Sequence, residues 1–332
     1  MNPFVESTKV VWENPQYVFV NEQAVADLAC KMAADDLKAP TWREEVFPES
    51  DNQILEFLGV ANAINFCFTD FKTGNKFDVE YPTGSGQIKK GAFAMAACLK
   101  RALDESVPVL DSKFLMNLGA REARSIFRCH KTEIPMFRER VENLRNVGYK
   151  LSASPLKSFK QLFERCDCRL FDSGGRGILN TLPRMFDSYQ DVFFWDNGRH
   201  IVRFQKRAQL LVLVYQGRAL SSAGRLPLLK DPEKIGPIAD YEVPRALRFF
   251  GILRYYKNLS ELVDGGVEIP KNSRMEIEIR AQTVQAMANL LTRINQLRPR
   301  NRQITMVELD YAIWSAARNI PQQHHYTYTT AY

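Results

Sequence analysis

The segment Ile238-Ala239-Asp240-Tyr241-Glu242-Val243-Pro244 places a carboxylate where a helix is expected to begin. Apolar residues recur at helical spacing after Asp240, and Pro244 is tolerated only in a first turn. Aspartate is a preferred N-cap, and the helix dipole stabilises its ionised form. Such a carboxylate can also stabilise the positive charge that develops as a glycosidic bond breaks. Asp240 is therefore either a cap alone, which this segment by itself favours, or a participant in chemistry.

Three cations, Arg203, Lys206 and Arg207, lie three or four residues apart or adjacent, which predicts one shared region of a helix surface. Like charges within one turn repel one another unless an anion lies nearby. The face is either solvated, with scattered carboxylate partners, or a phosphate site. The pattern alone favours the solvated face.

Near the end of the chain, Asp310 and Trp314 are four residues apart, and Tyr311 and Ser315 form the next row of the same predicted helix. An aspartate beside two aromatic rings can bind a flat, cationic ligand through charge and stacking. A half-buried Trp beside a surface Asp is the more common arrangement, and the spacing alone favours it.

The bulk composition is that of an ordinary globular protein, with 332 residues, 45% hydrophobic and 25% charged. A net charge of +7 favours phosphorylated or polyanionic partners. The first residues lack a signal-peptide pattern, and no apolar run is long enough to cross a bilayer. The six cysteines are scattered and fit no common zinc spacing. We expect a cytoplasmic protein with reduced thiols and neither a metal nor a cofactor.

Two glycine-rich stretches do not carry a nucleotide-binding motif. The stretch at 172–177 (DSGGRG) lacks the GK[ST] of a P-loop, and the one at 83–91 (TGSGQIKKG) is not the dinucleotide fingerprint. We expect both to be loops.

The periodicity predicts a mostly α protein with one small antiparallel β element near residues 60–82, where a TGN turn suggests a hairpin over 64–81. We expect residues 1–332 to form a single compact catalytic domain. Ser273 with Glu276, and Thr305 with Glu308, have the spacing of capping boxes that start two late helices. Further helices are predicted over 88–106, 135–149, 155–165, 200–218 and 241–256.

Six unlike motifs follow one another in this chain: NFCF (65–68), KGAFAMAACLKRALDE (90–105), VRFQKRAQ (202–209), IADYEVPRALRFFGIL (238–253), MEIEIRA (275–281) and LDYAIW (309–314). In this order they closely resemble the queuosine salvage family, the queuosine 5'-phosphate N-glycosylases/hydrolases, from about residue 10 onward. The resemblance implies a helical bundle related to helical DNA glycosylases. It also implies an enzyme that frees the base queuine from its nucleotide.

Matched position by position, the resemblance implies that Asp240 is the catalytic carboxylate, followed by Tyr241. The other implied substrate contacts are Lys206 of the KRAQ motif, Asp310 and Tyr311 of the LDY motif, and Asn65, Phe66 and Phe68 of the first motif.

The chain departs from the family at three positions, which we keep as substrate-binding candidates. Ile238 stands where a Phe is typical, and Ser315 stands where an Asp often follows the Trp. Phe47 lies in the neighbourhood of a family His.

The implied substrate is a 7-deazaguanine nucleotide whose side chain carries a secondary ammonium. Because this base has no N7, protonation there cannot help it leave. Asp240 would then stabilise the sugar cation or attack C1', and both routes stay open.

The other candidates take roles around this reaction. Asp310 pairs with the ammonium, and aromatic rings such as Phe68 or Trp314 stack on the base. Arg203, Lys206 and Arg207 hold the 5'-phosphate, with Lys206 preferred. Glu278 positions water or Lys206.

Two alternatives remain from other classes, a DNA or nucleobase N-glycosylase and a non-enzymatic nucleotide-binding protein. Residues 231–240 do not supply the glycine-rich hairpin with which a DNA glycosylase grips phosphates, and the chain has no strongly basic stripe. We therefore expect a small-molecule nucleotide as partner, with no stable nucleic-acid complex and no membrane.

Overall fold

The computed structural model describes residues 2–129 and 133–332, and α-helices dominate this part of the chain. The mostly α prediction is confirmed. The helices are α1 (Pro3–Trp12), α2 (Glu22–Ala34), α3 (Asp51–Ala63), α4 (Ala92–Asp104), α5 (Ser112–Met116), α6 (Ala120–Ile126), α7 (Phe137–Ala153), α8 (Phe159–Arg165), α9 (Ile178–Met185), α10 (Lys206–Leu220), α11 (Glu242–Phe249), α12 (Lys257–Asp264), α13 (Arg274–Leu297) and α14 (Met306–Ala317).

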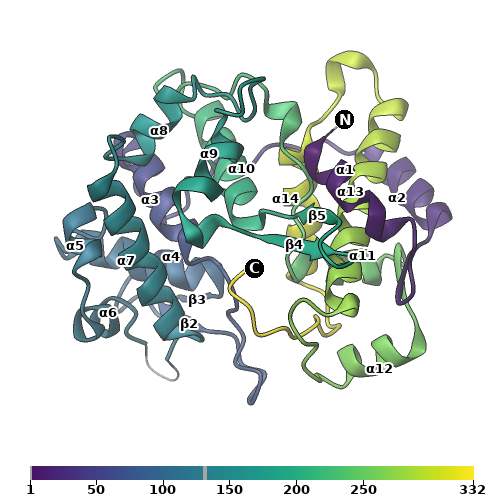
Figure 1. Ribbon diagram of the computed structural model, residues 1–332, viewed down its shortest axis with the longest axis horizontal. Helices are drawn as coiled ribbons and strands as arrows, with labels where there is room; N and C mark the ends of the chain where they lie inside the picture. Colours follow the sequence, from purple (N-terminus) through teal and green to yellow (C-terminus); the bar gives the residue numbers. More distant parts are fainter. Residues whose placement is uncertain (1, 130–132) are drawn as a thin grey trace.

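Helix α10 lies at the centre of the molecule (Figure 1). Helices α5–α8 lie on one side of it, and α1, α2, α12 and α13 on the other. Almost every side chain of α10 is buried, as expected of a helix covered on all sides. Its first residue, Lys206, faces the same cavity as α14, the start of α11 and the chain that follows α3.

The strands form three short antiparallel pairs. They are β1 (Val18–Val20) with β6 (Leu253–Tyr255), β2 (Asp78–Glu80) with β3 (Ile88–Lys90), and β4 (Val192–Trp195) with β5 (His200–Arg203). A small antiparallel element therefore exists, and the hairpin predicted around the TGN turn is partly confirmed, because backbone hydrogen bonds run from Phe77 to Phe68 and from Asp70 to Asn75. The paired strands are 78–80 and 88–90, and within 64–81 only Thr69 and Lys76 form a bridge.

Residues 64–68 did not become a strand because other groups take their carbonyls. Asn65 and Cys67 are buried as well as Ile64, Phe66 and Phe68, so the alternation of a half-exposed strand is absent. The guanidinium of Arg140 donates to the carbonyls of Ile64, Phe66 and Cys67. The segment is an irregular, buried part of the chain, and its Asn65 and Phe68 line the cavity.

The helix predicted over 200–218 begins six residues late. Residues 200–203 are strand β5, in which Val202 is buried between two exposed neighbours. Gln205 then takes a left-handed backbone with φ of 45°, and α10 starts at Lys206. Arg203 therefore does not share a helix face with Lys206 and Arg207.

The remaining helix predictions hold with shifted ends. The start of 88–106 is strand β3, and 241–256 stops at Phe249 because Gly251 takes a left-handed backbone (φ 71°) that ends the helix. Thr305 and Glu308 form the predicted capping box. The side chain of Ser273 caps α13 at the amide of Glu276.

A large hydrophobic cluster includes buried residues from Phe4 to Ile320, and a small one joins α1, β5 and α13. The division into domains stays a prediction. None of the helices in the described ranges combines the length and apolar character that a membrane crossing requires.

Candidate active site

A cavity of about 1110 Å³ opens between several parts of the chain. The predicted site residues among its lining come from the connection before α3, the segment after α3, the start of α10, the start of α11, and α14, while α3, β3 and α4 complete the lining. The predicted site residues that line it are Phe47, Asn65, Phe68, Lys206, Ile238, Asp240, Tyr241, Asp310, Tyr311 and Trp314. Residues nearly 270 positions apart in sequence thus meet around one space.

Asp240 caps helix α11 and also faces this cavity. Its Oδ1 accepts the amide protons of Glu242 (2.8 Å) and Val243 (2.9 Å). Both hydrogen bonds end on the same oxygen, so Oδ2 is available to a ligand. Burial raises the pKa of Asp240, and the charge of Lys206 and the two amides offset this only in part.

Lys206 lies beside Asp240 and is 4% exposed. Its Nζ donates to the backbone oxygen (3.2 Å) and side-chain oxygen (3.4 Å) of Asn65. Burial lowers the pKa of the ammonium to about 8, although the charge of Asp240 opposes that shift. A cation at this depth stabilises the ionised form of Asp240.

The buried ion pair between Asp191 and Arg280 fixes the backbone at Lys206 and next to Asp240. Asp191 accepts two hydrogen bonds from the guanidinium of Arg280, at 2.9 and 2.6 Å, and one from the amide of Lys206 at 3.0 Å. Arg280 also donates to the carbonyl of Ala239 (3.3 Å). The starts of α10 and α11 are therefore fixed relative to each other.

Asp310 is a buried carboxylate with an unsatisfied oxygen. Its side chain is 5% exposed, and Oδ1 has no hydrogen-bond partner in the described part of the chain. Burial, reinforced by the charge of Asp240, raises the pKa of Asp310 well above its usual value. A ligand group that is cationic or donates a hydrogen bond would satisfy this oxygen and favour the ionised form.

Aromatic rings form one wall of the cavity. Tyr311 is roughly parallel to Trp314 (6.2 Å between centroids) and meets the edge of Trp42 at 5.6 Å. Phe47 meets Trp42 at 5.9 Å and Phe93 at 6.3 Å. Such a wall suits a flat, weakly polar group such as a nucleobase.

Comparisons with known proteins show the family to which this chain belongs. Residues 46–332 match the model of a family described as "Queuosine salvage protein". The chain belongs to the queuosine salvage protein family. It is 31% identical to a protein of Sphaerobacter thermophilus over 95% of this chain and 92% of the relative. Relatives from Bos taurus (28%) and Mus musculus (26%) cover 95% and 94% of the chain and 92% of their own lengths. All three are named queuosine 5'-phosphate N-glycosylase/hydrolase.

Three residues that the family resemblance or the spacing suggested do not line the cavity. Arg203 is exposed on β5, and its amide donates to Ser7. Glu278 is fully buried and accepts the amides of residues 16–18 and the guanidinium of Arg274, so it fixes the approach to β1. Ser315 is half-buried on α14, outside the lining.

Two further residues support the cavity from outside. Arg207 is buried and donates to the carbonyl of Ala63 at 2.8 Å. Phe66 lies beneath the guanidinium groups of Arg140 (4.4 Å) and Arg207 (5.3 Å).

The sequence prediction missed a charged network beside Asp240. Glu242 is 4% exposed and pairs with Lys76 and Arg245, and all three line the cavity. The helical pattern sets Glu242 away from the buried stripe of its helix, and periodicity cannot show that Lys76 comes from a distant segment to pair with it. Trp42 was missed because it lies in an irregular connection that carries no motif.

Proposed function

We propose that this protein hydrolyses the N-glycosidic bond of queuosine 5'-monophosphate and releases free queuine. Membership of the family and the names of the relatives support this function. The observation that carries it is the pair of buried carboxylates, Asp240 and Asp310, beside the ammonium of Lys206 in a cavity with an aromatic wall.

In this reaction the bond between C1' and the base nitrogen breaks, and its electron pair leaves with the base. The hydroxyl of a water molecule bonds to C1' and its proton passes to the base nitrogen, which gives ribose 5-phosphate and queuine with its side-chain ammonium unchanged. Asp240 faces the developing sugar cation, which it stabilises by charge or by forming a transient bond to C1'. Lys206 keeps Asp240 ionised despite its burial.

The base is held by the opposite side of the cavity. The side-chain ammonium of queuine meets the free oxygen of Asp310, which exchanges an unsatisfied buried group for an ion pair. The rings of Tyr311 and Trp314 offer the stacking surface. Ligand binding therefore gives a partner to Oδ1 of Asp310, which has none among the described residues.

The 5'-phosphate lies at the cavity mouth in this proposal. Lys90 and Arg318 line the cavity, are exposed, and have no carboxylate partner within residues 2–129 and 133–332. Arg318 lies over the rings of Phe93 (5.4 Å) and Trp314 (5.3 Å), which hold it at the aromatic wall. Arg203 and Arg207 lie outside the lining, so we no longer assign the phosphate to them.

We infer that the free nucleotide is the partner, without a stable nucleic-acid complex or a membrane, and that the protein acts in the cytoplasm. Steep, salt-dependent binding to duplex DNA or RNA would contradict the first part of this inference.

The test is a mass-spectrometric assay of purified protein with queuosine 5'-monophosphate in water enriched in oxygen-18. We expect free queuine and ribose 5-phosphate that carries the heavy oxygen at C1'. Nucleotide binding without any release of base would contradict the proposal and indicate a binding protein. A protein mass increased by one ribose phosphate during turnover would show the covalent route for Asp240.

A further inference from the structure

The wall of the cavity that holds Trp42 and Phe47 has no regular structure. Residues 42–49 belong to the connection between α2 and α3, yet Trp42, Glu44, Glu45, Val46 and Phe47 all line the cavity. Trp42 takes a left-handed backbone with φ of 50°, which is unfavourable for a residue with a bulky side chain. Contacts outside the segment must therefore hold it in place.

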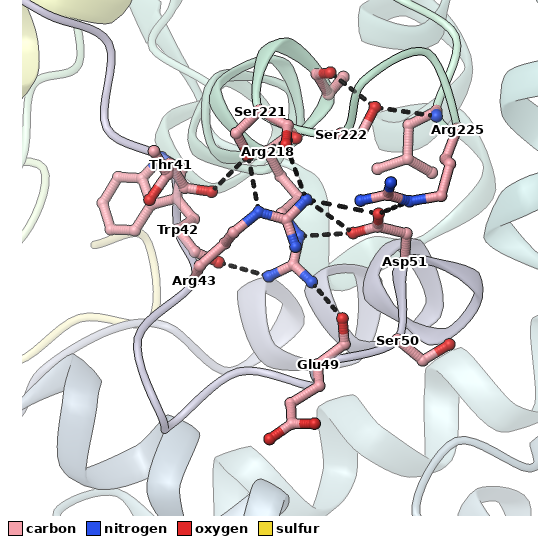
Figure 2. Close-up of polar contacts among 12 residues, drawn as sticks. Thr41, Trp42, Arg43, Glu49, Ser50, Asp51, Arg218, Ser221, Ser222 and Arg225 are labelled. Carbon is pink, nitrogen blue, oxygen red and sulfur yellow. Dashed lines mark hydrogen bonds and ion pairs between the residues drawn. The ribbon is translucent and has the colours of Figure 1, made fainter.

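A single buried guanidinium holds both ends of this wall (Figure 2). Arg218 is 1% exposed and donates to the carbonyl of Trp42 (2.7 Å) at one end and to those of Pro48 (3.0 Å) and Glu49 (2.7 Å) at the other. Its Nε donates to Asp51 at 2.7 Å. The wall is thus a short bridge fixed at both ends to helix α10.

Two more arginines complete the cluster. Arg225 donates to Asp51 at 2.8 Å, and Arg43 donates to Asp51 and to Ser221. Burial alone would raise the pKa of Asp51, but the hydrogen bonds from Arg218 and Arg225 lower it below its usual value. The carboxylate therefore stays ionised and keeps Arg218 oriented.

Gly217 lets the wall come close to α10. A Cβ at this position would lie 2.4 Å from the carbonyl of Pro40 and 2.9 Å from the ring of Trp42. The indole is therefore packed against the backbone of α10, and its ring makes edge-to-face contacts with those of Phe47 and Tyr311. Any shift of the wall moves the rings that surround the base.

We propose that Arg218 is a positioning residue that preforms the aromatic wall for the base, an inference that rests on the proposed function. Arg218 does not line the cavity and so acts through Trp42 and its neighbours. Asp240 and Lys206 are held separately, by the Asp191–Arg280 pair and Asn65. Loss of Arg218 should therefore weaken substrate binding much more than it slows the chemical step.

Arg101 offers a matched control. It is also a buried arginine, 8% exposed, and donates to main-chain carbonyls at the end of α6 and just beyond it, those of Ile126 and Arg128. None of these three residues lines the cavity. Arg101→Met should lower thermal stability without changing KM.

The experiment compares Arg218→Met, Arg218→Lys and Arg101→Met by kcat, KM and hydrogen exchange of residues 42–49. If the wall is ordered in about a tenth of Arg218→Met molecules, KM rises about tenfold while kcat stays within about threefold. Arg218→Lys should recover part of the affinity, because an ammonium keeps the pair with Asp51 but cannot reach both ends of the wall. An unchanged KM, or a change equal to that of Arg101→Met, would overturn the inference.

A second variant covers the case in which Arg218→Met does not fold. Gly217→Ala forces Trp42 away from α10 and should also raise KM with little change in kcat; an unchanged KM contradicts the inference. If the wild type releases no queuine, the proposed function fails. Hydrogen exchange measured without ligand still tests whether Arg218 positions residues 42–49. Faster exchange confined to 42–49 in Arg218→Met supports the positioning role, and unchanged or evenly increased exchange refutes it.

Discussion

Two buried charge clusters lie near opposite ends of helix α10, and they differ in how well their charges are satisfied. At Asp51, three arginines share one carboxylate, and the remaining donors of Arg218 are satisfied by carbonyls. At Asp240 and Asp310, two carboxylates share one lysine, and one oxygen of Asp310 has no partner among the described residues. The pKa of Asp51 is lowered, whereas those of Asp240 and Asp310 are raised.

The difference separates a cluster that stabilises the fold from one that is incomplete without a ligand. A buried charge is tolerated when hydrogen bonds replace its hydration, and it is costly when they do not. Carboxylates with a raised pKa beside a lysine with a lowered pKa, all in one cavity, are typical of sites where chemistry occurs.

The largest loss of stability should follow from breaking the cluster of arginines around Asp51. Asp51→Ala leaves the buried guanidinium of Arg218 without its anion and should lower the free energy of unfolding by about 3–5 kcal/mol. Urea denaturation at neutral pH measures this loss. A decrease in the free energy of unfolding of less than about 1 kcal/mol would show that this cluster contributes no more than an exposed ion pair.

The contribution of Asp51 to the free energy of unfolding depends on pH, because the pKa of Asp51 is lowered in the folded protein. Its stabilisation is fully present above the unfolded-state pKa of 3.8 and is lost as pH falls through the folded value. Asp51→Ala should therefore destabilise the protein less in acid than at neutral pH.

Changing Asp310 should affect binding while sparing the fold. Asp310→Asn removes the charge that pairs with the ammonium of the substrate, and KM should rise about 10- to 100-fold. Thermal stability should stay equal or rise, because a costly buried carboxyl becomes a neutral amide. Steady-state kinetics and a melting curve on the same sample test both parts, and an unchanged KM would remove the ammonium role.

The pH profile should show the lowered pKa of Lys206. Because the ammonium loses its proton near pH 8, kcat/KM should fall as pH rises through about 8, by up to tenfold per unit. The linkage to stability has the opposite sign. Between about pH 8 and the ordinary lysine pKa of 10.5 the unfolded chain binds more protons, so Lys206 makes stability rise with pH in that range. A profile that is flat to pH 9.5 contradicts the need for the ammonium.

The smallest effects should come from the exposed cations at the mouth. Lys90→Ala and Arg318→Ala should each raise KM for the nucleotide a few-fold, about the size of exposed charge interactions. The nucleoside, which lacks the phosphate, serves as the matched substrate. An equal change in KM for both substrates would place the phosphate elsewhere.

Local signals predicted the helical fold and the cap at Asp240, because spacing and capping are properties of neighbouring residues. They failed where contacts between distant segments determine the local structure. Strand β5 and the left-handed Gln205 separated Arg203 from Lys206, and the carbonyls of Ile64, Phe66 and Cys67 bind Arg140 instead of a strand partner. Glu242 and Trp42 entered the cavity lining through contacts across the fold. The resemblance supplied the candidates around the cavity, but it could not show that Glu278 serves the approach to β1.

The most direct test of the contrast between the two clusters is to measure queuine release and melting temperature together for Asp240→Asn. The amide oxygen can still cap α11, while the costly buried charge is gone. We predict that release falls by about 10²–10³-fold or more and that the melting temperature stays equal or rises. Release close to that of the wild type, or a melting temperature lowered as far as that of Asp51→Ala, would show that Asp240 serves mainly as the cap of its helix.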